Sequence, residues 1–412
     1  MSNCVPIERC LCCDSCNELL MDLGYQPLAN DFHPKNTVCF NYPLKLMVCP
    51  NCYHCQLSHS VDPEILFKNY KYVSGTSQTG LFFFKENAEF MVKYKNLTCG
   101  KVLDIACNDG SQLNFFKELG WETYGVDPAE NICPIAKANG HNIICDFWNK
   151  ETALRLPSMD IITAQNVFAH TQHIDDFLQN CKIVMNENTS LFIQTSQKNM
   201  IINGEFDTTY HEHISFFNTK SMDILTKRNG LILNRVLENN IHGGSYIFEI
   251  KIKRDDAIYD VDKHILNEEK LGIYSKHTYE NFNLNAIGCV KNLKYEITKY
   301  TNENKNENKN EYKCIGFGAA AKGQTVLCYG DIVLDYIIDE NPLKIGEYSP
   351  KMNIPIVGLD HFINESHEKY LIIILAWNFS KEIKNKLEKI KGNKKLTIIE
   401  KYFPEIIITE MT

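Results

Sequence analysis

The sequence lacks the charge pattern that would suggest a nucleic-acid partner. Its 412 residues contain 43 Lys and Arg against 51 Asp and Glu, which gives a formal net charge of -8. Proteins that bind DNA or RNA by displacing counterions need a basic surface instead. We therefore expect no nucleic acid among the partners of this chain.

Long hydrophobic runs are missing as well. The strongest apolar run, Leu371 to Trp377, is far shorter than the roughly 20 residues that a membrane-spanning helix needs. The first ten residues include polar and charged side chains and do not form the apolar segment of a secretion signal. These absences predict a soluble, cytoplasmic protein with no membrane partner, and we expect it to be a monomer.

The composition is otherwise that of an ordinary globular protein, with 44% hydrophobic and 23% charged residues. The length exceeds what one hydrophobic core usually organises, so several domains are expected. Pattern changes along the chain predict a Cys-rich domain at residues 1–80 and two α/β domains at residues 81–250 and 251–412. A polar low-complexity run at about 301–311 interrupts the last of these and is expected to be a solvated insertion.

Cysteine, in contrast, is abundant and unevenly distributed. Nine of the 17 cysteines fall within the first 55 residues, which favours a local metal site over disulfides in a chain without an export signal. Cys13-x-x-Cys16 and Cys49-x-x-Cys52 are spaced to hold one tetrahedral Zn²⁺. The additional thiols of Cys10, Cys12 and Cys55 leave the choice of ligands open. Four thiolate ligands leave no position for water, so we expect a structural zinc.

Apolar strands alternate with helical segments after the Cys-rich region. This order predicts right-handed crossovers and a mostly parallel sheet in each α/β domain, the second being smaller. The expected strands of the first sheet are residues 101–106, 123–127, 160–164 and 190–195, and those of the second are 313–317, 333–339 and 370–376.

A candidate ligand site follows the first strand of the first sheet. The turn Asp104-Ile-Ala-Cys-Asn-Asp-Gly110 lacks the three glycines of a dinucleotide site and contains only Gly110, so a ligand without phosphates fits it better. Asp127 ends the next strand, where a carboxylate accepts hydrogen bonds from a ribose diol. Asp104 or Asp109 is then expected to hold the other end of the ligand, and Asp146-Phe-Trp148 to flank its base.

Titratable side chains also gather after the third and fourth strands. Asn166-Val-Phe-Ala-His170 ends in one histidine, and Tyr210-His-Glu-His213 contains two more. Burial of such groups without partners costs several kcal/mol, roughly, so a site is favoured over a core position. Histidine has the pKa of a general base near neutrality, although support of a loop or a metal remains the alternative role.

These motifs together resemble a known family. The chain is similar, nearly from end to end, to the three-domain C-methyltransferases that act on dTDP-linked keto-deoxysugars. The resemblance includes the two CxxC pairs, Tyr70-Lys-Tyr-Val-Ser-Gly75, Asn108-Asp-Gly110, Asn166 to His170, Tyr210 to His213, His242-Gly-Gly-Ser245, Gly316-Phe-Gly-Ala-Ala-Ala-Lys-Gly323, Asp339-Glu-Asn-Pro342 and Ala376-Trp-Asn-Phe379.

The resemblance implies a fold, a cofactor and a set of roles. It implies a small zinc-binding domain, a Rossmann-like S-adenosylmethionine (SAM) methyltransferase domain and a degenerate Rossmann-like C-terminal domain. His213 takes the role of the base that removes a proton next to the sugar ketone, in a pocket shared with Tyr72, His170, Tyr210 and Glu212. SAM is held by Asp104, Asn108, Asp109, Gly110, Asp127, Asp146 and Asn166, and the nucleotide-sugar by His242, Lys322 and Trp377.

Alternatives remain at three points. Gly316-Phe-Gly318 after a strand equally fits a dinucleotide site, although the third glycine is missing. Tyr246-Ile247 stands where the family often has Leu-Arg, which leaves the sugar and the nucleotide open. The rival functions are an O- or N-methyltransferase of the same fold and a protein that binds nucleotide-sugars without turnover.

Overall fold

The computed structural model describes residues 3–68, 73–76, 78–196, 198–239, 243–302 and 312–411. The chain groups into two compact units, each assembled from separate segments. Tyr72, His242 and residues 303–311 of the expected insertion lie outside the described residues. Unit 1 comprises Met1–Glu18, Met47–Lys198 and Glu212–Tyr274, and unit 2 comprises Leu19–Leu46, Asn199–His211 and Ser275–Thr412.

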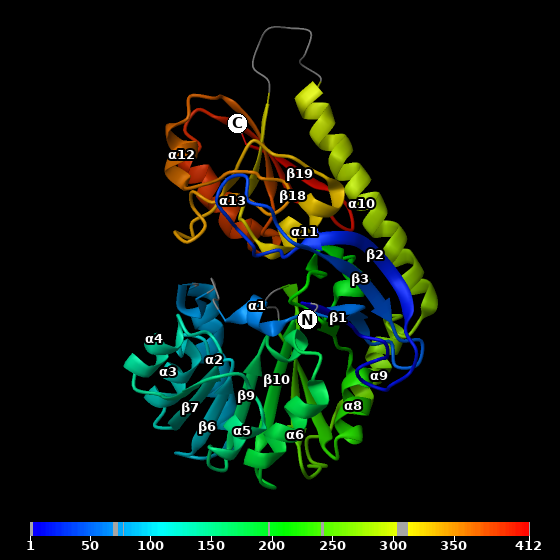
Figure 1. Cartoon of the computed structure of the whole chain (residues 1–412), viewed down its shortest axis with the longest axis vertical. Helices are drawn as coiled ribbons and strands as arrows, with labels where there is room; N and C mark the ends of the chain where they lie inside the picture. The colour runs from blue at the N-terminus through cyan, green and yellow to red at the C-terminus, as the bar shows by residue number, and fades with distance from the viewer. Residues whose placement is uncertain are drawn as a thin grey trace. The chain divides into compact units, whose positions relative to one another are not determined.

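A seven-stranded sheet forms the centre of unit 1, in the order β12-β13-β10-β9-β6-β7-β8. Figure 1 labels its strands β10, β9, β6 and β7. The neighbours from β8 to β10 are parallel, while β13 is antiparallel to both β10 and β12. The chain reverses its direction of travel across the sheet between β6 and β9, which is where doubly wound sheets bind ligands. The strands are β6 (Lys101–Ile105), β7 (Glu122–Asp127), β8 (Asn142–Cys145), β9 (Ile161–Gln165), β10 (Ser190–Ser196), β12 (Ile232–Asn239) and β13 (Ser245–Lys251).

Both faces of this sheet are apolar, because successive side chains of a strand point to opposite faces. Val102 belongs to the hydrophobic cluster on one face and Leu103 to the cluster on the other. Helices cover both faces and contribute residues such as Phe116 and Leu178 to the two clusters. The helices of unit 1 are α1 (Pro63–Phe67), α2 (Gln78–Lys95), α3 (Ser111–Glu118), α4 (Cys133–Ala138), α5 (Lys150–Leu154), α6 (Ile174–Val184), α8 (Thr219–Arg228) and α9 (Val261–Lys270), with the 3-10 turns η1 (Ser74–Thr76) and η2 (Phe168–His170).

Short strands complete unit 1. β1 (Cys4–Pro6) pairs antiparallel with β5 (His59–Val61), and β4 (Cys55–Leu57) pairs antiparallel with β11 (Ser215–Phe216). The second pairing links the Cys-rich segment to the residues that follow His213. Main-chain hydrogen bonds therefore bring these two distant parts of the sequence together.

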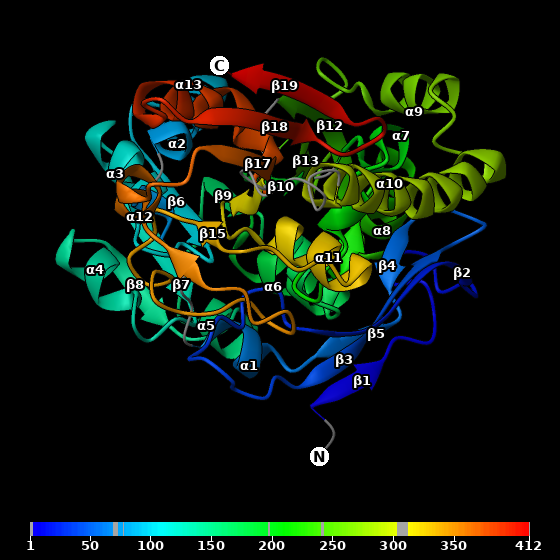
Figure 2. The ribbon, with the colours of Figure 1, turned by 90° about the horizontal axis from the view of Figure 1, so that it is seen from above.

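Unit 2 contains a six-stranded sheet in the order β16-β15-β14-β17-β18-β19, in which only β19 is antiparallel to its neighbour. Ile383 and Leu387 of α13 pack in one hydrophobic cluster with residues of β14, β17 and β18. Figure 2 labels α13, β17 and β18. The elements are β2 (Glu18–Pro27), β3 (Asn41–Val48), α7 (Met200–Asn203), η3 (Phe206–Thr208), α10 (Lys276–Asn302), β14 (Lys313–Phe317), α11 (Ala321–Gly330), β15 (Ile337–Ile338), β16 (Ile356–Val357), α12 (Leu359–Asn364), β17 (Lys369–Ile374), η5 (Trp377–Phe379), α13 (Ser380–Ile390), β18 (Lys395–Lys401) and β19 (Ile407–Met411).

The two parallel sheets confirm the expected α/β class. Most of the expected strands form within a residue or two, but the strand expected at 333–339 is reduced to β15, Ile337–Ile338. The segments also group differently from the expected contiguous domains, since residues 19–46 and 199–211 belong to unit 2. Across the described part of the chain, no helix combines the length and apolar character needed to cross a membrane.

Candidate functional site

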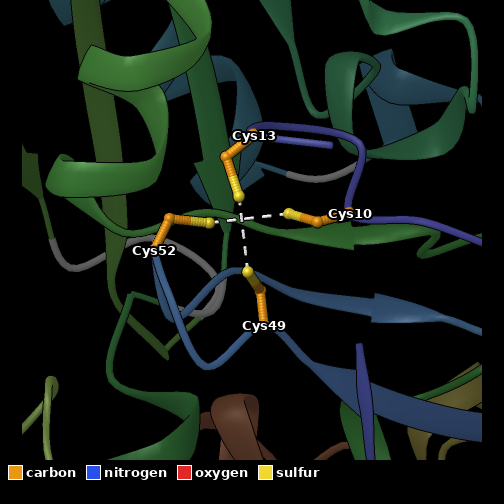
Figure 3. Close-up of side chains that lie close together, drawn as sticks. All are labelled: Cys10, Cys13, Cys49 and Cys52. Atoms are coloured by element: carbon orange, nitrogen blue, oxygen red, sulfur yellow. Dashed lines mark hydrogen bonds between the residues drawn. The ribbon is translucent and has the colours of Figure 1, made fainter. Parts of the chain in front are cut away.

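Two matching turns bring four thiols together in unit 1. In Cys10-x-x-Cys13 the N–H of Asp14 donates to the carbonyl of Cys10 at 2.9 Å, and in Cys49-x-x-Cys52 the N–H of Tyr53 donates to the carbonyl of Cys49 at 2.9 Å. Asp14 and Tyr53 both adopt positive φ, 59° and 58°. The two turns therefore have the same local conformation, and each directs a pair of sulfurs toward the other (Figure 3).

The four sulfurs are spaced for a metal ion. Cys10 Sγ lies 3.5 Å from Cys52 Sγ, Cys13 Sγ lies 3.4 Å from Cys49 Sγ, and all four sulfurs are within 4.8 Å of one another. A tetrahedral zinc with Zn–S bonds of about 2.3 Å separates its sulfurs by about 3.8 Å. Burial raises the pKa of Cys49 to about 11, so its thiol keeps its proton unless a cation replaces it. The cluster fits a closed structural zinc site.

The expected ligand set is wrong at one position. Cys16 is exposed and lies outside the cluster, and Cys10 takes its place. The reason is that the turn at Cys10-x-x-Cys13 reproduces the turn at Cys49-x-x-Cys52, whereas Cys16 lies beyond it, in an isolated bridge with Arg9. Cys10-x-x-Cys13 is itself a CxxC pair, so its spacing in the sequence could have identified it.

The N-terminus of α8 holds one of these turns. Asn218, the N-cap of α8, donates from its side-chain amide to the carbonyls of Cys52 at 3.2 Å and Tyr53 at 2.8 Å. The buried cysteines also share a hydrophobic cluster with the first sheet. The zinc site is therefore packed into the core of unit 1.

The expected donor loop follows β6 and has an unusual backbone. Ala106, Asn108 and Gly110 adopt positive φ of 61°, 51° and 78°, a conformation that residues with a Cβ rarely take. A Cβ on Gly110 would also lie 2.8 Å from the Cδ2 of His141. Such backbone strain is typical of ligand-binding loops.

Hydrogen bonds fix the shape of this loop. The N–H of Asn108 donates to Asp127 at 2.8 Å, and the side chains of Asn108 and Asp109 accept from the N–H groups of Ser74 and Gly75, each at 2.9 Å. The 3-10 turn η1 therefore lies directly against the loop.

Three carboxyl groups give the loop an acidic interior. Burial raises the pKa of Asp104, and repulsion from Asp127 and Asp109 raises it further. Burial also raises the pKa of Asp127, against two backbone N–H groups that lower it. A ligand with positive charges relieves this repulsion, and SAM carries both a sulfonium and an ammonium group. The residues present therefore fit SAM.

Asp127 and Asp146 lie at the carboxyl ends of neighbouring strands, as expected. Asp127 accepts from the N–H of Asn108 and, at 2.8 Å, from that of Ala129, which leaves acceptor capacity on its carboxylate. Asp146 follows β8 and is exposed. Trp148, which was expected to flank the base of the ligand with Asp146, packs on α6 instead. Its indole N–H donates to the carbonyl of Phe177 at 3.2 Å, and its ring contacts the ring of Phe177.

Two histidines expected in one pocket do come together. The ring centroids of His170 and His213 are 5.2 Å apart. The ring of Phe67 stacks on that of His170, with centroids 5.8 Å apart. The N–H of Ile214 donates to the carbonyl of Ala169 at 2.8 Å, which holds the two segments side by side. Burial lowers the pKa of His170 to about 4, so this imidazole is neutral near pH 7.

The other expected residues of this pocket are distributed over both units. Glu212 is buried and belongs with His213 to unit 1, whereas Tyr210 belongs to unit 2. Asn166 is in unit 1 at a positive φ of 51°, and its buried Oδ1 has no hydrogen-bond partner among the described residues.

Lys322 and Trp377, the expected substrate residues of unit 2, lie next to each other. The ammonium of Lys322 lies 4.1 Å from the centroid of the Trp377 ring, and burial lowers the pKa of Lys322. The indole N–H of Trp377 donates to the carboxylate of Asp207 at 2.8 Å, and the hydroxyl of Tyr402 donates to the same carboxylate at 2.6 Å. Asp207 is fully buried and was not expected in this role.

Sequence reasoning also missed three buried amides at the first sheet. Gln112 and Gln165 donate to the hydroxyl of Thr163 at 3.3 and 2.6 Å, and Gln194 pairs in register with Gln165. Each of the three carries a buried oxygen without a hydrogen-bond partner in the described residues. A glutamine at the carboxyl end of an otherwise apolar strand is the signal that could have identified Gln165 and Gln194.

The chain is similar to characterised methyltransferases. It is 26% identical to the C-methyltransferase NovU of Streptomyces niveus over 99% of this chain and 98% of that protein. It is also 26% identical to the mitochondrial ubiquinone biosynthesis O-methyltransferase of Mus musculus, over 34% of this chain and 44% of that protein. Among solved structures, the magnesium protoporphyrin IX methyltransferase ChlM of Synechocystis with bound SAM matches 42% of this chain and 79% of its own, with 15% identity and a TM-score of 0.33.

Family models match three consecutive parts of the chain. Residues 10–67 match a zinc binding domain, residues 77–234 a methyltransferase domain and residues 240–399 a C-methyltransferase C-terminal domain. The first match contains the four clustered thiols, and the second contains the acidic loop and both paired histidines. The chain therefore belongs to the SAM-dependent C-methyltransferases in which these three domains follow one another, with SAM and structural zinc as cofactors.

Proposed function

We propose that this C-methyltransferase acts on a carbon atom of a dTDP-linked keto-deoxysugar and that His213 is its general base. The observation that carries the proposal is the close pair of imidazoles, His170 and His213, with ring centroids 5.2 Å apart. Both lie in segments that adjoin the sheet carrying the acidic donor loop. The similarity to NovU along almost the whole chain supports transfer to carbon.

The chemistry requires a base more than it requires activation of the methyl group. When bound, SAM supplies a methyl group on a sulfonium, which is already an excellent leaving group. A sugar carbon is nucleophilic only after it loses a proton, and a neighbouring ketone makes that proton acidic enough for an imidazole. General bases of this kind contribute roughly 100- to 10,000-fold to a rate.

Removal of the proton precedes transfer of the methyl group. An imidazole nitrogen of His213 takes the proton, the electron pair of the C–H bond moves into the enolate, and the enolate carbon then forms the bond to the methyl group. Bound SAM would supply that methyl group, and the electron pair of the C–S bond would leave with S-adenosylhomocysteine. His170 is neutral near pH 7 because burial lowers its pKa to about 4, so it adds no positive charge beside the base.

The remaining residues hold the two substrates. Asp127 retains acceptor capacity for the ribose hydroxyls of SAM, and the acidic loop of Asp104, Asn108, Asp109 and Gly110 surrounds its cationic end. Asp146 and Asn166 complete the donor site at the carboxyl edge of the sheet. Following the family resemblance, Glu212 and Tyr210 are expected to assist the base, and Lys322 and Trp377 to bind the nucleotide-sugar.

Product analysis tests this proposal. The protein is incubated with SAM carrying a carbon-13 methyl group and with a panel of nucleotide-linked keto-sugars, and the products are examined by mass spectrometry and NMR. We expect a labelled methyl group on a carbon next to the ketone of one dTDP-linked sugar. A label on oxygen or nitrogen overturns the carbon assignment, and binding of the sugars without any product makes the chain a nucleotide-sugar-binding protein.

A further inference from the structure

A small cavity in unit 2 adjoins the segment that leads into Glu212 and His213. The space open to the centre of a water-sized sphere is about 10 Å³. One water needs roughly 10–15 Å³ by this measure. Every residue around it belongs to unit 2. The cavity is lined by Gln26, Pro27, Ala29, Leu44, Tyr210, His211, Gln324, Thr325 and Cys328.

Three of the lining side chains carry buried polar atoms without partners. These atoms are Oε1 of Gln26, Nδ1 of His211 and both terminal atoms of Gln324, and none has a hydrogen-bond partner within the described residues. Gln324 is 1% exposed and His211 is 2% exposed, so bulk water does not reach them. A buried polar group without a partner is destabilising, and four such atoms on three residues that line one cavity call for a common partner.

The tautomer of His211 follows from its other nitrogen. Nε2 lies 3.4 Å from the carbonyl oxygen of Tyr42, and the ring also interacts with the backbone of Pro43. Since carbonyl oxygens only accept hydrogen bonds, we assign the proton to Nε2. Burial lowers the pKa of His211 to about 4, and the ring is therefore neutral near pH 7. Nδ1 is then an acceptor and needs a donor.

The same accounting applies to the two glutamines. The amide nitrogen of Gln26 donates to the carbonyl of Leu23 at 2.7 Å, which leaves its Oε1 as a second acceptor among the residues that line the cavity. Two acceptors cannot bond to each other. The amide of Gln324, on α11, offers donors and one more acceptor.

We infer that the cavity binds one ordered water molecule, which donates to His211 and Gln26 and accepts from Gln324. This arrangement gives the water three hydrogen bonds, the number typical of buried waters, and leaves Oε1 as the one unsatisfied atom of Gln324. His211 is thereby fixed in one tautomer and orientation from both of its nitrogens.

Gln324 and Gln26 are then positioning residues for His211 and, through the main chain, for its neighbour Tyr210. The expected effect on turnover rests on the proposed function, in which His213, two residues further along the chain from His211, is the base. The water site itself does not depend on the proposed function. None of the three side chains contacts a reacting atom in this arrangement. They act by holding the main chain that ends at His211.

A crystal structure of the full-length protein tests the water directly. We expect electron density for a water within hydrogen-bond distance of His211 Nδ1, Gln26 Oε1 and Gln324 Nε2, and its loss in Gln324→Leu. A direct bond from Gln324 to His211, or an empty cavity in the wild-type protein, overturns the inference.

The urea concentration at the midpoint of unfolding gives an independent test, because the two possibilities predict different changes in it. If the water completes a network, Gln324→Leu lowers the midpoint, because His211 and Gln26 lose their shared partner. If the amide is unpaired in the native protein, the substitution leaves the midpoint unchanged or raises it, and the inference is overturned. Thr325→Val is the matched control, since Thr325 lines the same cavity but its hydroxyl donates to the carbonyl of Ala321 at 3.2 Å.

Turnover and spectroscopy separate positioning from stability. In folded Gln324→Leu we expect the nitrogen-15 signal of His211 Nδ1 to shift and kcat to fall about tenfold, the effect of roughly one hydrogen bond, with the KM for SAM unchanged. An unchanged kcat together with a shifted signal overturns the positioning role and keeps the water. If the wild-type protein turns over no substrate, the proposed function is overturned. The crystal structure and the urea midpoints still test the water site in that case.

Discussion

The two mostly parallel sheets of this protein carry turns that are held by the same kind of hydrogen bonds, but the charged residues around those turns differ. In unit 1, Gly110 follows β6 with a φ of 78°, and in unit 2, Gly318 follows β14 with a φ of 87°. In each sheet an aspartate at the end of the neighbouring strand accepts two main-chain hydrogen bonds. One donor is an N–H group of the turn, and the other is the N–H group two residues after the aspartate. The bonds are 2.8 and 2.8 Å for Asp127 and 2.6 and 2.8 Å for Asp339.

The charges around the two turns differ. The turn in unit 1 is surrounded by Asp104, Asp109 and Asp127. Burial and the neighbouring carboxylates raise the pKa of Asp104 and of Asp127, and this acidic cluster suits a cationic ligand. The turn in unit 2 leads instead to Lys322 in the first turn of α11. Because the aspartate-to-turn bonds occur in both units, they show how such a turn is built rather than what it binds. The ligand is indicated by the charges.

The largest expected difference between the units is in their need for metal. Cys10→Ser should lose zinc and unfold unit 1, because metal binding supplies about 10 kcal/mol or more of folding free energy in small zinc domains. Cys16→Ser, the matched control, should keep one zinc per chain, since Cys16 is exposed and outside the cluster. Metal analysis and circular dichroism of both variants measure this. Equal loss of zinc from the two would restore Cys16 as a ligand.

The next largest effect concerns the base, for which unit 2 offers no counterpart in the proposal. His213→Ala should lower the rate of methyl transfer by roughly 100- to 10,000-fold and leave SAM affinity unchanged, since a base acts on the barrier. It should also abolish exchange of the sugar's proton with deuterated water in the presence of a non-transferring SAM analogue.

His173→Ala is the control for this experiment because His173 is exposed. Wild-type exchange in the His213 variant, with loss in His170→Ala, would transfer the role of base to His170. Wild-type exchange in both variants would remove the carbon-methylation mechanism.

The two aspartates provide the sharpest test of the comparison. Asp127→Asn keeps one oxygen acceptor for the turn but removes the charge, and it should weaken SAM binding about 100-fold, since hydrogen bonds to charged groups contribute about 1.5–3 kcal/mol each. Asp339→Asn makes the same change in unit 2 and should leave SAM affinity within about twofold of wild type. Calorimetry measures both, and equal losses would show that the charge at Asp127 does not select the ligand.

The smallest expected effect is on stability in acid. The pKa of His170 falls from 6.5 to about 4 on folding, because burial disfavours the charged ring. The contribution is therefore fully present above pH 6.5 and is lost as the pH falls toward 4, since the unfolded chain takes up the proton first. We expect on the order of 2 kcal/mol, allowing for partial exposure of the ring. His170→Gln should flatten the urea midpoint between these pH values, and an unchanged slope would contradict the shift.

Local pattern alone predicted much of this protein. Strands such as Lys101–Ile105 and Ile161–Gln165 are runs of apolar residues that only a covered sheet accommodates, and their positions were predicted to within a residue or so. The CxxC spacing predicted a zinc site, and the motif ending in His213 predicted a histidine beside His170. These features depend on residues close in sequence, or on the rule that parallel strands end at one edge.

Tertiary structure alone decided which distant groups meet. The choice of Cys10 over Cys16 depended on two turns with the same backbone, 39 residues apart in the sequence. Trp377 donates to Asp207 across 170 positions, and the unpaired atoms of Gln26, His211 and Gln324 adjoin one cavity from three segments. Sequence periodicity shows which face of an element is buried, but the partner of a buried polar group depends on which elements pack there, and that is determined only when the chain has folded.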